Sequence, residues 1–377
     1  MPGQHERALE ALHRRGRLRR LQPQRGTDFT SNDYLGLAQS GELRAAIAQA
    51  LDHGVPAGAG GSRLLRGNHP EHEALEQEAA AYFGSEAALY FGSGYAANSA
   101  VFSTLPARGD LIVYDALVHA SAHEGMRLSK AEATAARHND PQSFEDAITQ
   151  WRKAGGLGQP WIAVESLYSM DGDFAPLASL AAIAGRHDAM LMIDEAHATG
   201  VLGPRGRGLS AGLEGRANVV TLHTCGKALG VSGALVLSSR ILCDYLINRA
   251  RAFIYATAPS PLMAAGVRAA LRLSNDGDER RSKLAALVGF AGRELEAKTG
   301  IVASGSQIQP VILGADTRAV AIADAMQSRG FDIRAIRPPT VPEGSARLRL
   351  TLTLHSNEQD VAALIAAIAQ EQARLAA

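Results

Sequence analysis

Three groups of residues with chemical potential each follow a short apolar run of the chain. After ALYF (88–91) come Gly92, Gly94 and Tyr95; after MLMI (190–193) come Asp194 and His197; after NVVTL (218–222) come Thr224 and Lys227. In an open α/β sheet, ligands bind beyond the carboxyl ends of the strands. If the three runs are strands of one sheet, these side chains lie at one edge and can share a ligand.

Lys227 is the most distinctive of these residues. It lies in GKALGVSG (226–233), between small residues and two apolar runs. Most lysines are exposed at the surface, whereas a tight, partly desolvated loop favours the neutral amine. This is the setting of a lysine that forms a Schiff base with a carbonyl compound.

The sequence DEAH (194–197) is also the signature of a helicase box, and that interpretation fails here. A helicase needs a phosphate loop of the form G-x-x-x-x-G-K-[ST]. Lys227 is followed by Ala228, and Thr221 stands at the position of the first glycine. What remains is an acid at a strand end, which taken alone could equally be a helix cap or an ion-pair partner.

Taken together, the three groups match the needs of pyridoxal 5'-phosphate (PLP). The cofactor requires a lysine for its aldehyde, an acid against the ring nitrogen, donors for the phosphate and the phenolic oxygen, and a planar group over the ring. Lys227 can supply the amine and Asp194 the acid. His197 can donate to the phenolic oxygen, and His119 can cover the ring. Gly94, Tyr95 and Thr224 can hold the phosphate. No metal site is expected.

Two alternatives stay open at this point. The turn that begins at Gly92 satisfies G-x-G-x-x-A, and Asp115 ends the next strand about 20 residues later, which formally matches a dinucleotide fingerprint. A nicotinamide-dependent oxidoreductase would leave Lys227 and Asp194 unexplained. A non-catalytic protein that uses the cofactor fold to bind partners is the other alternative.

The elements that position these residues alternate between strand and helix. Further apolar runs are LIVY (111–114), WIAV (161–164) and GALVL (233–237), and near-continuous apolar strands suit a sheet buried on both faces. The pattern predicts a mostly parallel α/β sheet between helices. We expect a basic helical arm over 1–35, a large domain over 36–272, and a smaller α+β domain over 273–377.

Composition and charge exclude several classes of protein. The 38 Lys and Arg balance 38 Asp and Glu, so nothing points to nucleic-acid or membrane binding. The two cysteines, Cys225 and Cys243, exclude a disulfide scaffold. No apolar run reaches the roughly 20 residues that span a bilayer, and the N-terminus lacks the core of a signal peptide. We expect a cytoplasmic enzyme.

The chain resembles the α-oxoamine synthases, which are fold-type I PLP-dependent transferases. The resemblance covers nearly the whole length. It rests on SNDYLGL (31–37), GAGGSR (58–63), HEALE (72–76), SGYAAN (93–98), HAS (119–121), SMDGD (169–173), DEAHATG (194–200), GKALGVSG (226–233) and AIRPPTVPEGSARLRLTLT (335–353).

The resemblance assigns a role to each matching residue. Lys227 would bind the cofactor and act as the base, Asp194 would pair with the ring nitrogen, His197 with the ring hydroxyl, and His119 would stack on the ring. Gly94, Tyr95 and Thr224 would hold the phosphate, Ser169 would contact the cofactor, and Thr257 would reach the phosphate of the neighbouring subunit of a homodimer. Asn32, Thr340 and Arg349 would lie on the substrate side, and Arg19 would meet the acyl substrate.

The resemblance also implies the reaction. The last motif is most similar to members that condense L-alanine with pimeloyl-CoA, or with pimeloyl acyl-carrier protein, and release CO₂ in biotin biosynthesis. A member that takes glycine and acetyl-CoA is the near alternative. From the residues alone, either Arg337 or Arg349 could hold the amino-acid carboxylate. Cys225 stands where the family often has an aromatic or apolar residue, and we expect a buried, unreactive thiol there.

Overall fold

The computed structural model describes residues 2–375, which form two compact units. One unit comprises residues 35–169 and 174–281, and we call it the sheet unit. The other comprises residues 1–34, 170–173 and 282–377, and we call it the terminal unit because it contains both chain termini. The domain boundaries expected at residues 35 and 272 stay predictions.

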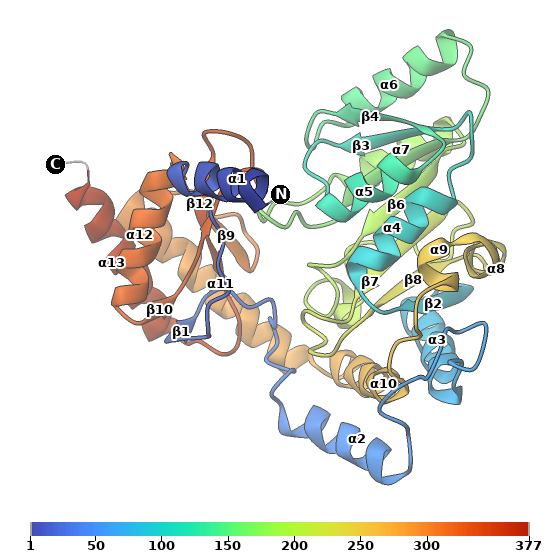
Figure 1. Cartoon of the computed structure of the whole chain (residues 1–377), viewed down its shortest axis with the longest axis horizontal. Coiled ribbons are helices and arrows are strands. Elements are labelled where there is room, and N and C mark those ends of the chain that lie inside the picture. Colours follow the sequence, from blue (N-terminus) through green and yellow to red (C-terminus); the bar gives the residue numbers. More distant parts are fainter. Residues whose placement is uncertain (1, 376–377) are drawn as a thin grey trace. The chain divides into compact units, whose positions relative to one another are not determined.

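The sheet unit is built on a seven-stranded sheet with the strand order β2-β8-β7-β6-β5-β3-β4 (Figure 1). Only β8 is antiparallel to its neighbours. The mostly parallel sheet predicted from the sequence is thus confirmed. The strands are β2 (Ala87–Phe91), β3 (Leu111–Asp115), β4 (Glu132–Ala136), β5 (Pro160–Glu165), β6 (Met190–Asp194), β7 (Val219–Thr224) and β8 (Ala234–Ser238).

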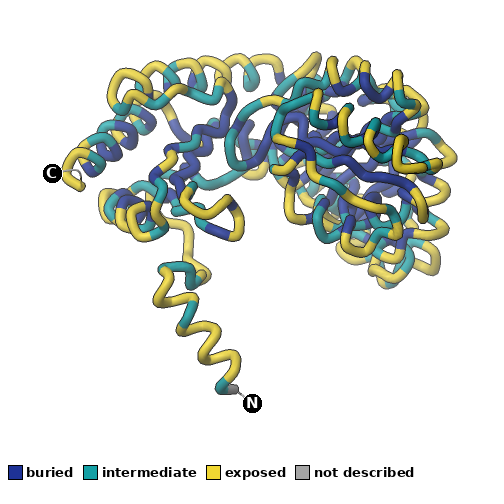
Figure 2. Tube along the Cα trace, turned by 90° about the horizontal axis from the view of Figure 1, so that it is seen from above, coloured by how far each residue is buried: buried dark blue, intermediate teal, exposed yellow. Residues whose placement is uncertain are grey.

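Helices cover both faces of this sheet, which explains why its strands are apolar on both sides. Phe102 of α4 and Met126 of α5 belong to the core on one face, whereas Phe144 of α6 and Leu180 of α7 belong to the core on the other. Figure 2 shows buried segments enclosed by more exposed ones, and every residue of β2, β5, β7 and β8 is buried. These helices are α4 (Gly94–Thr104), α5 (Ala120–Leu128), α6 (Pro141–Lys153) and α7 (Leu177–Arg186).

The remaining helices of the sheet unit lie outside this alternation. They are α2 (Gly41–Asp52), α3 (Pro70–Phe83), the short 3₁₀ helix η1 (Pro204–Gly206), α8 (Arg240–Arg249), α9 (Arg251–Ile254) and α10 (Pro261–Asn275). Helix α3 begins with His69 as its N-cap and Pro70 in the first turn, and it ends at Gly84 in the left-handed conformation. A proline in the first turn and a left-handed glycine after the last turn are both common at helix ends.

The terminal unit combines a small antiparallel sheet with helices. Its sheet has the order β11-β12-β9, and a parallel pair joins β1 to β10. The elements are α1 (Pro2–Arg14), β1 (Thr27–Asp28), β9 (Ile308–Gly314), α12 (Asp316–Ser328), β10 (Phe331–Asp332), β11 (Ala335–Ile336), β12 (Ala346–Thr351) and α13 (Glu358–Arg374). Helix α11 (Asp278–Thr299) begins in the sheet unit and passes into the terminal unit at Ser282. Across residues 2–375, no helix has the length and apolar character needed to cross a membrane.

Candidate active site

The turn between β2 and α4 presents the helix N-terminus next to β7. Ser93 caps α4 by accepting a hydrogen bond from Ala96 N, and Gly94 and Tyr95 occupy the first helical positions. The N–H groups at these positions have no acceptor within the helix. A Cβ built on Gly94 would lie 3.5 Å from Thr224 Oγ1. Helix N–H groups and a hydroxyl therefore meet at one point, as an anion site requires.

Asp194, at the end of β6, is held by two donors. Its Oδ2 accepts a hydrogen bond from Asn98 Nδ2 of α4 at 2.7 Å, and its Oδ1 accepts one from Ala196 N at 2.9 Å. Asn98 also donates to Ser121 Oγ at 3.0 Å, and Ser121 Oγ lies 2.8 Å from His119 Nδ1. Asp194 and His119 are thus linked through Asn98 and Ser121, which fixes both side chains.

His119 is the N-cap of α5, and this role sets its protonation. Its Nδ1 accepts a hydrogen bond from Ser121 N at 3.2 Å, so in the neutral ring the proton lies on Nε2. Burial is the main cause that lowers the pKa of His119. The charge of Asp194 acts to raise this pKa, whereas Lys227 and His123 lower it further. A neutral, oriented imidazole is suited to lie against a flat aromatic ligand.

Lys227 and His197 are in direct contact. Lys227 Nζ lies 2.7 Å from His197 Nε2, and His197 is buried. The loop that carries Lys227 makes a tight turn, since Gly230 has φ +68° and a Cβ there would lie 2.4 Å from Ala38 N. The glycine at this position is therefore required by the close approach of two backbone segments.

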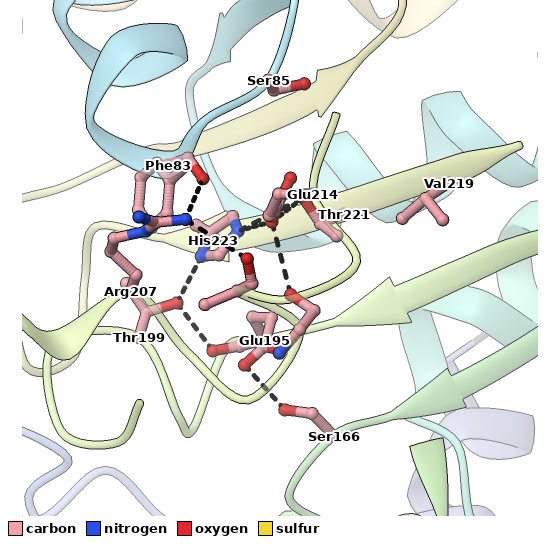
Figure 3. A network of polar contacts seen from close by, with 12 residues as sticks. Phe83, Ser85, Ser166, Glu195, Thr199, Arg207, Glu214, Val219, Thr221 and His223 are labelled. Carbon is pink, nitrogen blue, oxygen red and sulfur yellow. Dashed lines mark hydrogen bonds and ion pairs between the residues drawn. The ribbon is translucent and has the colours of Figure 1, made fainter. Parts of the chain in front are cut away.

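Glu195 anchors the segment that follows Asp194 (Figure 3). Its carboxylate accepts hydrogen bonds from Ser166 Oγ at 2.8 Å, Leu209 N at 3.1 Å and Ser210 N at 2.5 Å. The side chain is fully buried, and burial raises its pKa against the opposing effect of His223. Glu195 thus ties the DEAHATG segment to Leu209 and Ser210.

His223 continues the same buried network on β7 (Figure 3). The Thr199 hydroxyl donates to Glu195 O at 2.7 Å and lies 2.9 Å from His223 Nδ1. His223 Nε2 lies 3.1 Å from Glu214 Oε1, and its ring packs on Phe83 with 3.8 Å between centroids. The network therefore joins the segment that carries His197 to the strand that leads to Lys227.

Arg349 lies in the terminal unit with the predicted substrate residue Asn32. Both terminal nitrogens of Arg349 donate to Asn32 Oδ1, at 3.2 and 3.1 Å, and Nη1 donates to Thr351 Oγ1 at 2.9 Å. Arg347 on the same strand forms an ion pair with Asp171 at 2.5 Å. Arg337 Nη1 donates to the backbone oxygen of Gly16. Asn32 and Thr351 thus orient the Arg349 side chain, and its role toward a substrate carboxylate stays a prediction.

Arg19 and Thr340 are also brought together, by a hydrogen bond of 3.1 Å from Arg19 Nη2 to Thr340 Oγ1. Arg19 lines a groove of the terminal unit with a volume of about 510 Å³. The groove combines apolar and basic side chains and is lined by Leu9, Leu12, Arg15, Arg17, Leu18, Arg19, Pro338, Pro339, Val341 and Glu343. Arg17 is held by Asp316 and Glu343, each at 2.6 Å.

The structure accounts for the remaining candidates individually. Ser169 is buried and donates its backbone N–H to Glu165 Oε2 at 3.1 Å. Thr257 is exposed in the loop after α9, and its role toward a second subunit stays a prediction. Cys225 is fully buried, and burial raises the pKa of its thiol, as an inert cysteine would show.

The dinucleotide interpretation of Asp115 is wrong. Asp115 is fully buried, and its carboxylate accepts hydrogen bonds from Leu117 N at 2.9 Å and Asn139 N at 2.8 Å, with His138 Nδ1 also at 2.8 Å. A ribose-binding acid must present a free oxygen to the ligand. Asp115 instead fixes the loops that follow β3 and β4.

The residues present in the sheet unit fit PLP. The anion turn at Gly94 and Thr224, the fixed acid Asp194, the contact between Lys227 and His197, and the neutral His119 supply the groups that the cofactor requires. Within the described part of the chain, no group of three or more His, Cys, Asp or Glu side chains could hold a metal ion.

Sequence reasoning missed two residues of this arrangement. Asn98 lies one turn after Gly94, and only the packing of α4 on α5 reveals that it bridges Asp194 and Ser121. Glu165 ends β5 as Asp194 ends β6, so the rule that drew attention to Asp194 applies equally to Glu165.

Comparisons with known proteins identify the family of this chain. The family model for class I and II aminotransferases matches residues 24–368. The 8-amino-7-oxononanoate synthase of Chromobacterium violaceum is 44% identical over 339 residues, which cover 89% of this chain and 87% of that protein. The 8-amino-7-oxononanoate synthase of Anaeromyxobacter sp. (strain K) is 42% identical over 377 residues, which cover 96% of this chain and 93% of that protein.

Solved structures show the same fold. Serine palmitoyltransferase from S. paucimobilis, with a bound PLP–myriocin aldimine, superposes with a TM-score of 0.86 at 26% identity, covering 93% of this chain and 88% of that chain. The 8-amino-7-oxononanoate synthase from Francisella tularensis gives a TM-score of 0.79 at 28% identity, and the match covers 93% of this chain and 99% of that chain. The chain therefore has the fold of the fold-type I PLP enzymes, and it belongs to the class I and II aminotransferase family, together with relatives named 8-amino-7-oxononanoate synthase.

Proposed function

We propose that this protein is an 8-amino-7-oxononanoate synthase, which joins L-alanine to a pimeloyl thioester with loss of CO₂ in biotin biosynthesis. The observation that carries the proposal is the set of Lys227, His197, Asp194 and His119, assembled in the sheet unit of a chain 44% identical to an enzyme of that name. Each side chain of the set corresponds to one requirement of PLP chemistry.

When bound, PLP supplies an electron sink for negative charge at the amino-acid Cα. The chain's own residues have separate tasks toward it. Lys227 provides the amine for the aldehyde and takes the Cα proton. Asp194 keeps the ring nitrogen protonated, and Asn98 orients Asp194. The buried His197 donates to the phenolic oxygen, and the neutral ring of His119 covers the ring face.

The anion turn holds the phosphate in this proposal. The N–H groups of Gly94 and Tyr95 point out of the helix N-terminus, where the helix dipole favours negative charge. The Thr224 hydroxyl adjoins the same turn. Ser169 contributes a further contact, and Thr257 reaches the phosphate of the second subunit in a homodimer.

The substrates are assigned to residues of the terminal unit. Arg349 binds the alanine carboxylate, because a guanidinium fork matches a carboxylate in geometry and charge. Asn32 already accepts both terminal N–H groups of this fork, which fixes its orientation.

The groove at Arg19 favours a long acyl chain over the acetyl group that a 2-amino-3-oxobutyrate CoA ligase would take. Its leucine and proline side chains suit methylene groups, while Arg15 and Arg19 offer positive charge to the far carboxyl group or to the phosphates of the thioester carrier. CoA and acyl-carrier protein are both compatible with this charge. The enzyme is assigned to the cytoplasm, where both donors occur.

The test is product analysis by mass spectrometry after incubation of the PLP-loaded protein with L-alanine and pimeloyl-CoA. We expect 8-amino-7-oxononanoate, free CoA and CO₂, and none of them with Lys227→Ala. Acetyl-CoA with glycine serves as the matched substrate pair for the alternative. Faster turnover of glycine with acetyl-CoA would refute the assignment. If neither CoA thioester reacts but pimeloyl acyl-carrier protein does, the acyl donor is the carrier protein.

A further inference from the structure

Glu165 is a buried carboxyl group on the strand next to Asp194. It ends β5, and its Cα is the register partner of the Asp194 Cα in the parallel β5–β6 pair. Trp161 and Ala163 precede it on the face of the sheet covered by α4 and α5. Because side chains alternate along a strand, Glu165 points to this same face. Neighbouring strands are about 4.8 Å apart, so two carboxyl groups adjoin each other.

The two carboxyl groups differ in the donors that surround them. Both oxygens of Asp194 accept hydrogen bonds, from Asn98 and Ala196, as a carboxylate requires. Glu165 accepts one hydrogen bond, at Oε2 from Ser169 N. Its Oε1 is buried and has no hydrogen-bond partner among the described residues. An ionised carboxylate in this state would lack donors that its charge demands.

Glu165 also lines a small cavity with residues of the site. The cavity has a volume of about 20 Å³, which is room for about one water molecule. Glu165 shares its lining with Asn98, His119, Asp194 and Thr221, and the wall is otherwise apolar. Glu165 therefore adjoins the same group of side chains that is proposed to hold the cofactor ring.

The charges around Glu165 have opposite effects on its pKa. Asp194 on β6 and Asp115 on β3 disfavour a further negative charge, and Lys227 after β7 favours it. His119 before α5 is the remaining titratable group of the cavity lining, and its pKa is lowered, so it adds no positive charge at neutral pH. Burial dominates these effects and raises the pKa of Glu165 to about 8.

We propose that Glu165 is a positioning residue that carries a proton at neutral pH, so that the negative charge of the β5–β6 pair stays on Asp194. The inference deepens the proposed function, on which its consequences for the cofactor rest. A single charge at this edge matches the single positive charge of a protonated ring nitrogen. Loss of the Glu165 proton would add a second negative charge, which favours the ammonium form of Lys227 and removes the proposed base.

The test compares the wild-type protein with Glu165→Gln. Glutamine has the same shape and can accept from Ser169 N, but it never ionises. Glu132→Gln is the control, because Glu132 is exposed on β4. The first readout is the infrared carbonyl band of a protonated carboxylic acid, recorded with PLP bound and after its removal. We expect a band at pH 7 that Glu165→Gln lacks, that Glu132→Gln retains, and that the wild type loses as the pH rises through about 8.

The second readout is turnover and the PLP absorbance spectrum across the same pH range. At pH 7 we expect Glu165→Gln to turn over within about threefold of the wild type, because one neutral group replaces another. The ratio of Glu165→Gln to wild-type turnover should then rise as the pH passes about 8, with a matching spectral step in the wild type alone.

Two results would overturn the proposal. One is a wild-type infrared spectrum at pH 7 without the band that Glu165→Gln should remove. The other is a tenfold or larger loss of turnover by Glu165→Gln at pH 7, since that would mean that an ionised Glu165 is needed. The infrared band requires neither substrate nor cofactor, so it reports on Glu165 even where the proposed reaction fails.

Discussion

The hydroxyl of Thr199 offers a sharp test of the buried network behind the active site. Its side chain is 2% exposed and bridges Glu195 O and His223 Nδ1. Replacement by valine keeps the shape but removes both hydrogen bonds. Replacement by serine keeps both hydrogen bonds and removes one methyl group. The two variants therefore separate the hydroxyl from the packing of the side chain.

The expected loss of stability follows from the groups that each variant leaves without a hydrogen-bond partner. Glu195 O still accepts from Ala198 N and Thr199 N in the valine variant, so the carbonyl stays satisfied. Nδ1 of the fully buried His223 loses its hydrogen-bond partner, at a cost of about 1–3 kcal/mol, and the lost hydrogen bond to the carbonyl adds about 1 kcal/mol. We expect Thr199→Val to lower the free energy of unfolding by about 2–4 kcal/mol, and Thr199→Ser by about 1 kcal/mol.

The assay is the urea midpoint of the unfolding transition that both variants share with the wild type. Both changes lie in the sheet unit, so the same transition can be compared without assuming that the whole chain unfolds in one step. We expect the valine midpoint to fall well below the serine midpoint at an unchanged slope. Equal midpoints would refute the reasoning, because the hydroxyl would then contribute nothing and the network would not hold the two segments together.

Three further outcomes are expected. Asp194→Asn keeps the shape of the side chain but removes its charge, so turnover with PLP bound should fall at least ~10²-fold; activity near that of the wild type would assign the ring nitrogen to another acid. Arg349→Lys loses the guanidinium fork and should weaken alanine binding by about 1.5–3 kcal/mol while leaving the KM for pimeloyl-CoA nearly unchanged; the opposite split would move Arg349 to the acyl donor. Gly230→Ala should lower the unfolding midpoint, because φ is +68° and the Cβ would meet the Ala38 backbone at 2.4 Å, whereas Gly226→Ala in the same loop should be tolerated, since its nearest neighbours are 4.0 Å away.

The strands of the sheet unit were predictable where they are buried on both faces. All six residues of β5 and all six of β7 are buried, and both strands appear in the sequence as apolar runs. Strand β4 was missed, because Glu132–Ala136 forms an edge of the sheet with three of its residues exposed. An edge strand needs no apolar run, so its sequence EATAA carries no signal of a buried strand.

The grouping of the candidate site residues was predictable as far as the ends of the strands determine it. Lys227, Asp194 and His197 meet because parallel strands end at one edge, and that rule needs only the positions of the strands. The contacts of Arg337 and Arg349 could not be predicted in this way. Arg337 donates to Gly16 O, 321 positions away in the chain, and no local pattern reports such a contact.

Three carboxyl groups at the ends of β5 and β6, those of Glu165, Asp194 and Glu195, show how surroundings divide their roles. Asp194 and Glu195 are consecutive, yet Asp194 lines the cavity between the sheet and α4, and Glu195 accepts three hydrogen bonds from the opposite network. Glu165 adjoins Asp194 but receives one donor instead of two. Because the chemical group is the same in all three, only the number of donors and the depth of burial can separate them. The division into a charged acid, a protonated neighbour and a structural anchor therefore follows from the backbone N–H groups and amides that the fold aims at each carboxyl group.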